Sequence, residues 1–144
     1  MTPTDLARFI AKCRFDPGTG CVIWTGGQTS GRGHSSPYGA FWFAGRRWFA
    51  HRWAAQFIHG LDIDGAQVDH CCPPGRTGYG FAPPNTLCVH HVRPLSPAAN
   101  RQKQTLDQRR YWIYCQVGLE EPPPIWANNF TEIPFYPEPE WMKQ

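Results

Sequence analysis

Cysteine and histidine residues gather in two short segments, and this clustering constrains the fold more than any other feature of the chain. The first segment is Val68-Asp69-His70-Cys71-Cys72 and the second is Leu87-Cys88-Val89-His90-His91. No apolar run follows Met1, so we expect an intracellular, reducing setting rather than secretion, and no membrane span. In that setting, clustered Cys and His indicate metal binding before disulfide bonding. The segments therefore predict a fold built around a metal ion.

The composition predicts a small domain with a limited core. The chain has 144 residues, which suits one domain, and its apolar content is unusually aromatic, with 7 Trp, 9 Phe and 5 Tyr. The 14 Gly and 15 Pro imply many turns. We expect a loop-rich α+β fold whose small core needs reinforcement.

Charge divides the chain into a basic body and an acidic tail. Residues 1–117 hold 13 Lys/Arg against 6 Asp/Glu, a balance of +7, whereas residues 118–144 hold 1 against 5, a balance of −4. A basic body suits a polyanion such as nucleic acid, although many proteins of this charge bind none. The tail is rich in Pro and aromatic residues, which predicts an extended segment docked on the body or on a second subunit.

Hydrophobic periodicity and turn residues predict an alternation of short elements. A Ser-Pro pair is a strong helix start because Ser can cap and Pro loses no intrahelical bond at the first position. The predicted elements are a helix over 5–12 capped by Thr4, a strand over 21–24, a hairpin over 38–50 turning at Ala44-Gly45, a helix over 51–59 ended by Gly60, a strand around Val68, an irregular loop over 73–85, and a helix over 97–116 that begins at Ser96-Pro97.

A set of motifs follows this order of elements. The motifs are Cys21-Val22-Ile23-Trp24-Thr25-Gly26, Ala50-His51-Arg52, Val68-Asp69-His70, Cys72 with Cys88, then His91 and Asn100. Together they resemble the ββα-metal (His-Me finger) nucleases, in particular the phage-type HNH endonucleases and the His-Cys box homing endonucleases. The likeness covers about residues 21–100. It departs from the family pattern in having fifteen residues between Cys72 and Cys88, two between Cys88 and His91, and no Asn-Pro before that His.

The resemblance implies a structural zinc site. Its ligands would be Cys21, Cys72, Cys88 and His91, a tetrahedral set that contributes folding free energy. His90 is a rival for the histidine position, and isolated buried thiols are the alternative interpretation. The remaining thiols are interpreted as core or surface residues; they are Cys13, Cys71 and Cys115.

The resemblance also implies a catalytic centre with a second, harder metal. His70 would be the general base, since an imidazole that titrates near neutrality can take a proton from water. Asp69 and Asn100 would hold Mg²⁺ or a similar cation through oxygen atoms. Neighbouring strand residues point to opposite faces, so Asn100 is the firmer of the two ligands. An Asp-His pair alone would more often be a surface turn.

Basic residues supply candidates for DNA contact. The resemblance implies that Arg47 clamps the scissile phosphate, with an exposed strand residue as an equal alternative. Weaker candidates are Arg32, Arg46, Arg52, Lys103 and Arg109. Arg52 can equally be a buried partner for an acid. A two-stranded ribbon such as the predicted hairpin fits the major groove of duplex DNA.

These features together predict a zinc-stabilised, magnesium-dependent DNA endonuclease that hydrolyses phosphodiester bonds and resembles homing endonucleases. Two alternatives remain open. One is a zinc module that binds nucleic acid without cutting it. The other is an interaction protein whose function lies in the acidic tail, and that tail can also join two subunits in a homodimer.

Overall fold

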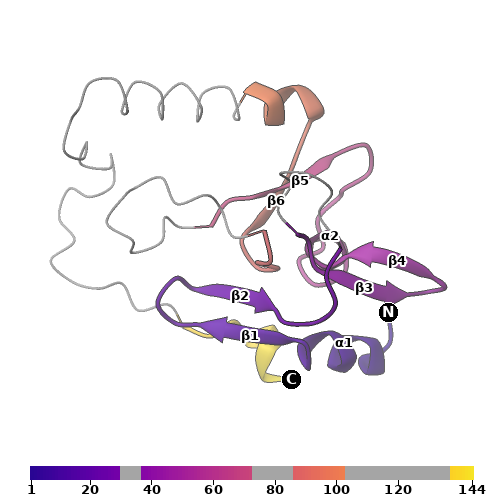
Figure 1. Cartoon of the computed structure of the whole chain (residues 1–144), viewed down its shortest axis with the longest axis vertical. Coiled ribbons are helices and arrows are strands. Elements are labelled where there is room, and N and C mark those ends of the chain that lie inside the picture. The colour runs from indigo at the N-terminus through magenta and orange to yellow at the C-terminus, as the bar shows by residue number, and fades with distance from the viewer. Residues whose placement is uncertain (30–36, 73–85, 103–136) are drawn as a thin grey trace, which may run out of the picture.

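The computed structural model describes residues 1–29, 37–72, 86–102 and 137–144. In these ranges the chain forms helices and short antiparallel strand pairs, in agreement with the α+β prediction (Figure 1). The elements are α1 (Pro3–Ile10), β1 (Cys13–Asp16), β2 (Cys21–Trp24), β3 (Ala40–Phe43), β4 (Arg46–Phe49), α2 (Ala50–Phe57), β5 (Gln67–His70), β6 (Val92–Leu95) and the 3₁₀ helix η1 (Glu140–Lys143).

Helix α1 begins two residues earlier than the sequence analysis predicted. Thr2, not Thr4, is its N-cap, and the Thr2 and Asp5 side chains each accept a hydrogen bond from the other residue's backbone N–H. Pro3 follows at the first helical position, where its missing N–H costs no bond. This reciprocal capping box is a stronger start signal than Thr4 alone, so the prediction of a Thr4 cap was wrong.

Strand β2 was predicted correctly, but its partner β1 was not. The two strands pair antiparallel with Asp16 opposite Cys21 and Cys13 opposite Trp24. The intervening turn is closed by Asp16, whose side chain accepts from the Gly18 N–H and the Thr19 hydroxyl. This turn fixes the start of β2, where Cys21 lies.

The predicted hairpin is formed by β3 and β4. Ala40 pairs with Phe49 and Phe43 with Arg46, so the turn consists of Ala44 and Gly45. Both turn residues have positive φ, 49° and 76°, as a two-residue hairpin turn of the mirror-image type requires. The alternation of buried and exposed residues gives the hairpin one face on the core and one in solvent.

Helix α2 follows β4 directly and runs over residues close to those predicted. Its C-cap is Ile58 rather than Gly60, but Gly60 has a φ of 64° and turns the chain just beyond the helix. The predicted strand at Val68 is β5, and it pairs antiparallel with β6, which was not predicted. After β6 the Ser96 hydroxyl accepts from the Ala99 N–H, and residues 97–102 are helical, which confirms the predicted helix start.

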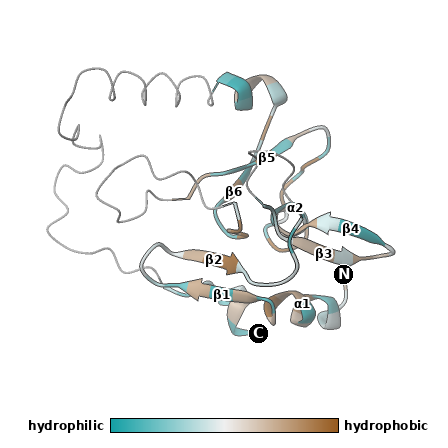
Figure 2. Cartoon of the chain, viewed as in Figure 1, coloured by the Kyte–Doolittle hydropathy of each residue, from teal (hydrophilic) through white to brown (hydrophobic). Residues whose placement is uncertain are grey.

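The core is dominated by stacked and edge-to-face aromatic rings. Phe9 of α1 lies 4.4 Å from the Trp53 ring of α2 and 4.9 Å from the Trp24 ring of β2. Phe41 of β3 contacts all three rings. Figure 2 shows β2 as hydrophobic, in contrast to the hydrophilic colouring of β4. These contacts join α1, β2, the hairpin and α2 around one core cluster, which also includes Val89 from the second Cys/His segment.

The end of the chain returns to this core. Trp141 and Met142 of η1 pack against the core cluster, as expected of tail aromatics, and Figure 1 shows the C-terminus near β1. No helix in the described ranges is both long and apolar enough to cross a membrane. Several predictions lie outside the described residues: the loop over 73–85, most of the helix over 97–116, the tail up to residue 136, Arg32, Lys103, Arg109 and Cys115.

Candidate functional site

Three cysteines and one histidine meet at one point of the structure. The ligand atoms of Cys21, Cys72, Cys88 and His91 all lie within 4.8 Å of one another, close enough to bind one metal ion. The His91 Nδ1 atom lies 3.4 Å from the Cys21 Sγ and 3.8 Å from the Cys88 Sγ. In a tetrahedral zinc site this separation is about 3.6 Å, as follows from ordinary Zn–S and Zn–N bond lengths. The four donors therefore fit zinc in type, number and spacing.

Backbone pairing holds the four ligands together. The segment that carries Cys88 lies along β2, with hydrogen bonds from Trp24 N to Leu87 O and from Val89 N to Val22 O. Cys88 itself bridges Ile23. On the other side, the Cys71 N–H donates to the His91 carbonyl and so brings the end of β5 to the same place. The fifteen-residue spacing from Cys72 to Cys88 therefore does not separate the ligands.

The proton affinities of these groups are shifted by their mutual contacts. Hydrogen bonds from Cys21, Cys72 and His91 hold the pKa of the Cys88 thiol well below its ordinary value. Hydrogen bonds to Cys21 and Cys88, together with burial, raise the pKa of the Cys72 thiol. Hydrogen bonds to Cys21 and Cys88 raise the pKa of His91 to about 9. Without a metal the cluster thus favours a Cys88 thiolate beside a His91 imidazolium, and a cation at the centre would replace that positive charge.

His91, not its rival His90, belongs to the cluster. The His90 ring lies 5.5 Å from the ring of His59 and 6.2 Å from that of Trp141. Its Nδ1 is buried, and in the described part of the chain no hydrogen-bond partner reaches it. Of the other thiols, Cys13 is partly buried and donates to the Phe9 carbonyl, whereas Cys71 is exposed. Both match the interpretation of core or surface residues.

His70, the predicted base, contacts the Cys/His cluster through a hydrogen bond to the backbone carbonyl of Cys88. Its Nε2 lies 3.1 Å from the Cys88 carbonyl oxygen, and the side chain is 6% exposed. Because a carbonyl oxygen only accepts, Nε2 carries the proton of the neutral ring, and the lone pair lies on Nδ1. Cys88, a member of the Cys/His cluster, thereby fixes the tautomer of the predicted base.

His51 is a neighbour of His70 to which the sequence analysis assigned no role. Its ring lies 4.7 Å from that of His70, is 6% exposed, and has no hydrogen-bond partner for Nδ1 among the described residues. Burial, aided by the positive charge that His70 can carry, lowers the pKa of His51 to about 3. His51 is therefore a neutral ring packed beside the predicted base. The signal was its place in Ala50-His51-Arg52, which was interpreted as a helix start.

The predicted magnesium ligands lie on the other face of β5. The Asp69 carboxylate accepts from Arg93 Nε at 3.1 Å, directly across the strand pair. The Asn100 Nδ2 donates to Gln67 Oε1 at 2.6 Å, so Asn100 lies over the face that Gln67 and Asp69 share. The Asn100 Oδ1 is buried, and no described group donates to it. Such an orphaned oxygen is a suitable ligand for a hard cation, whereas Arg93 competes for Asp69.

The predicted DNA-binding arginines divide into two groups. Arg46 and Arg47 are exposed on β4, with the Arg46 guanidinium stacked 3.9 Å from the Trp48 ring. Arg52 instead donates to the carbonyls of Ala66 and Ile63 at 3.0 and 3.5 Å. Arg52 therefore anchors the loop before β5 through carbonyl groups rather than through an acid.

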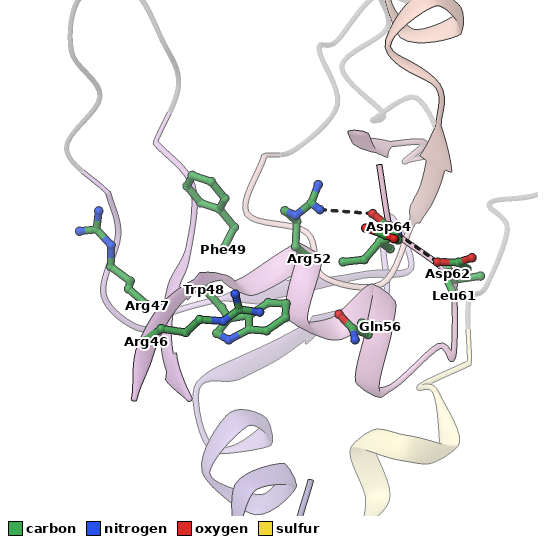
Figure 3. A pocket seen from close by; sticks show the side chains of 10 residues that line it. Arg46, Arg47, Trp48, Phe49, Arg52, Gln56, Leu61, Asp62 and Asp64 are labelled. Carbon is green, nitrogen blue, oxygen red and sulfur yellow. Dashed lines mark hydrogen bonds between the residues drawn. The ribbon is translucent and has the colours of Figure 1, made fainter. Parts of the chain in front are cut away.

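A pocket of about 520 Å³ lies among these arginines (Figure 3). Its walls come from β4, α2 and the loop over residues 61–64, and they include Asp62 and Asp64. The pocket includes Arg47 but neither His70 nor Asn100. It is thus separate from both candidate metal positions, and its mixed charges give it no clear ligand.

Comparisons of the chain with protein-family models, with curated protein sequences and with solved structures yield no match. The chemistry of the site therefore depends on the geometry described above.

Proposed function

We propose that the protein is a zinc-stabilised, divalent-ion-dependent DNA endonuclease of the ββα-metal type. The observation that carries the proposal is the link between His70 and the metal cluster. The predicted base is held in one tautomer by the carbonyl of Cys88, a member of that cluster. His70 ends β5, which pairs antiparallel with β6, and the helix start that carries Asn100 follows β6 along the chain.

In the proposed mechanism His70 activates a water molecule. Its Nδ1 takes the proton from water as the oxygen attacks phosphorus, and the bond to the leaving sugar oxygen breaks. The neighbouring neutral ring of His51 and the aromatic ring of Tyr38, 6.2 Å away, keep the imidazole in place. Arg47 would hold the phosphate, since it is exposed on β4 and its guanidinium can bind two oxygens.

The two metals have separate roles in this proposal. Zinc held by Cys21, Cys72, Cys88 and His91 would fix β2, β5 and the segment before β6 to one another. Asn100, with Asp69 if Arg93 releases it, would hold the catalytic cation. The chemistry that a bound Mg²⁺ supplies is stabilisation of negative charge on the phosphate and the leaving oxygen.

Two observations favour the alternative of a zinc module that binds nucleic acid without cutting it. His70 is almost fully buried, and Asp69 is engaged by Arg93. Both residues could serve structure alone. The alternative keeps the zinc cluster and the exposed arginines of β4 but needs no water-activating base.

Cleavage of supercoiled plasmid by the zinc-loaded full chain distinguishes the two. We expect Mg²⁺-dependent nicking or cutting that EDTA stops, and a fall on the order of 10²- to 10⁴-fold for His70→Ala. His59→Ala is a matched control, because His59 is a partly buried histidine that also contacts a carbonyl, that of Val89 at 3.1 Å. Equal cleavage by His70→Ala and the wild type, with equal zinc content, would reject the mechanism.

A further inference from the structure

The solvent face of the β3–β4 hairpin exposes large aromatic rings. Trp42 is 62% exposed and Phe49 is 44% exposed, and with Met1 they are the exposed large hydrophobic residues of the described chain. The core cluster buries the rings of Phe9, Trp24, Phe41 and Trp53, so this fold buries aromatic side chains where it can. Two large rings left in solvent on one hairpin indicate a binding surface rather than unused core.

Strand register places these rings beside Arg47. Trp42 is the direct cross-strand partner of Arg47, and Phe49 follows Arg47 by two residues on the same face. Arg46 and Trp48 project to the opposite face, where they stack on each other. Figure 3 shows the Arg47 and Phe49 side chains extending away from the Arg46–Trp48 pair. Trp42, Arg47 and Phe49 therefore form one surface, which we term the ring face.

The charges around the ring face suit a polyanion. Among the residues that the structure describes, neither Arg46 nor Arg47 belongs to an ion pair. Arg8 of α1 reaches the same hairpin, donates to the Trp42 carbonyl at 3.3 Å and is itself paired with Asp5. Of these three arginines, Arg47 combines a guanidinium outside any described ion pair with a place on the ring face, which matches a strand that has phosphates along one side and bases along the other.

The rings favour unpaired bases over a duplex groove. Base edges in a groove are read by side chains that donate and accept hydrogen bonds, such as Asn, Gln and Arg. On the ring face the groups that can donate are the Arg47 guanidinium and the Trp42 indole N–H, and most of the surface is flat π-face. Base faces are hidden inside a duplex but are available in a single strand.

A line of ring contacts leads from this surface to His70. Phe49 lies 5.6 Å from Tyr38, Tyr38 lies 5.2 Å from His51, and His51 lies 4.7 Å from His70. We propose that the ring face binds single-stranded DNA by stacking unpaired bases on Trp42 and Phe49, with Arg47 on the backbone. The substrate of the nuclease would then be DNA with an unpaired segment beside the scissile bond. This last statement rests on the proposed function, whereas the binding itself does not.

Binding is measured by fluorescence anisotropy with the zinc-loaded full chain in the absence of Mg²⁺, so that no cleavage is needed. The probes are a labelled single-stranded oligonucleotide of mixed sequence and a blunt duplex of equal length. We expect tighter binding of the single strand. Trp42→Ala should weaken it about tenfold or more, Trp42→Phe should restore most of the affinity, and Phe49→Ala should act as Trp42→Ala does. Duplex binding should change far less.

Arg47→Ala tests the backbone contact, with Arg14→Ala as its control because Arg14 is an exposed arginine on β1. Arg47→Ala should reduce the salt dependence of binding, and Arg14→Ala should not. The inference is overturned if the single strand binds no better than the duplex. It is also overturned if Trp42→Ala leaves the affinity for the single strand unchanged, as expected if a protein segment covers the ring face. Single-strand binding without any plasmid or single-strand cleavage would uphold the ring face and reject the nuclease.

Discussion

The metal cluster and the two faces of β5 differ in how completely their groups are assembled. At the cluster, four donor atoms from three separate segments lie within 4.8 Å of one another. At β5, His70 lies on the buried face against Cys88, whereas Asp69 and Asn100 lie on the other face beside Arg93 and Gln67. The ligand atoms of the cluster are already close enough to bind one ion, whereas at β5 the candidate base and the candidate cation ligands lie on opposite faces.

This difference shows that a proposed metal site can be tested by geometry more strictly than a proposed catalytic site. Four ligands of one ion must converge on one point, so their meeting is informative by itself. A base and a hard-metal ligand need only reach the same phosphate, and substrate completes their arrangement. The cluster supports a structural metal directly, while the catalytic assignment depends on experiments that change one face at a time.

The largest expected effect comes from removing a ligand of the Cys/His cluster. Cys88→Ser removes a thiol whose pKa the neighbouring Cys21 and Cys72 hold below its ordinary value, and it should abolish zinc binding and the folded state, since structural zinc contributes on the order of 10 kcal/mol in small domains. Cys71→Ser, which changes an exposed thiol next to Cys72, should leave both intact. Zinc content of the purified proteins and near-ultraviolet circular dichroism measure the outcome. A Cys88→Ser protein with one tightly bound zinc would contradict the ligand set.

The next effect tests whether Asp69 and Asn100 hold the catalytic cation. Asn100→Ala removes the orphaned Oδ1 and should raise the Mg²⁺ concentration needed for half-maximal cleavage by about ten- to a hundredfold. Arg93→Ala removes the cation that competes for Asp69 and should lower that concentration. Mg²⁺ titrations of the cleavage rate give both values. If neither substitution moves the Mg²⁺ requirement, this face of β5 is structural.

The sequence was sufficient to predict the cluster because its ligands are distinctive residue types. Cys21, Cys72, Cys88 and His91 were named from motif order, and the structure brings all four together. The choice of His91 over His90 depended on which ring faces the thiols, and spacing alone left it open. The contacts of His90 with His59 and Trp141 come from elements distant in sequence.

The strands β1 and β6 were missed for a physical reason. The Cys-Arg-Phe-Asp alternation of β1 is short and falls between a predicted helix and a predicted turn, so it was not recognised, and β6 contains Pro94, which removes a backbone donor. Both strands are defined by pairing with β2 and β5, so their partners, not their own composition, determine them. Missing β6 also concealed Arg93, the residue that engages Asp69.

A smaller effect tests the packing of Gly39 against Trp24 of β2, the strand that carries the cluster ligand Cys21. A Cβ at Gly39 would lie 2.5 Å from Trp24 Cδ1, and Trp24 ends the strand that Cys21 begins. Gly39→Ala should therefore lower the free energy of unfolding by about 1–3 kcal/mol. Gly27→Ala is the matched control, since its Cβ would meet nothing within 4 Å. Chemical denaturation of the zinc-loaded proteins compares them. Equal stabilities would show that the Trp24 packing does not constrain β2.

The smallest effect concerns protons at the cluster. His91 has a pKa of about 9 in the metal-free protein, because it lies against the Cys21 and Cys88 sulfurs. Zinc must displace that proton to bind Nδ1, so its affinity should rise with pH by at least about tenfold per unit. The contribution of His91 to this slope should end once the pH exceeds about 9. Competition with a chromophoric chelator at several pH values measures the slope.

His90→Ala is the control and should leave the slope unchanged, because burial lowers the pKa of His90 to about 4 and leaves no proton there to displace. His91→Ala should lower the slope by about one proton below pH 9; an unchanged slope in that variant would mean that zinc binds without displacing a His91 proton, and the assembled site would then rest on its cysteines alone.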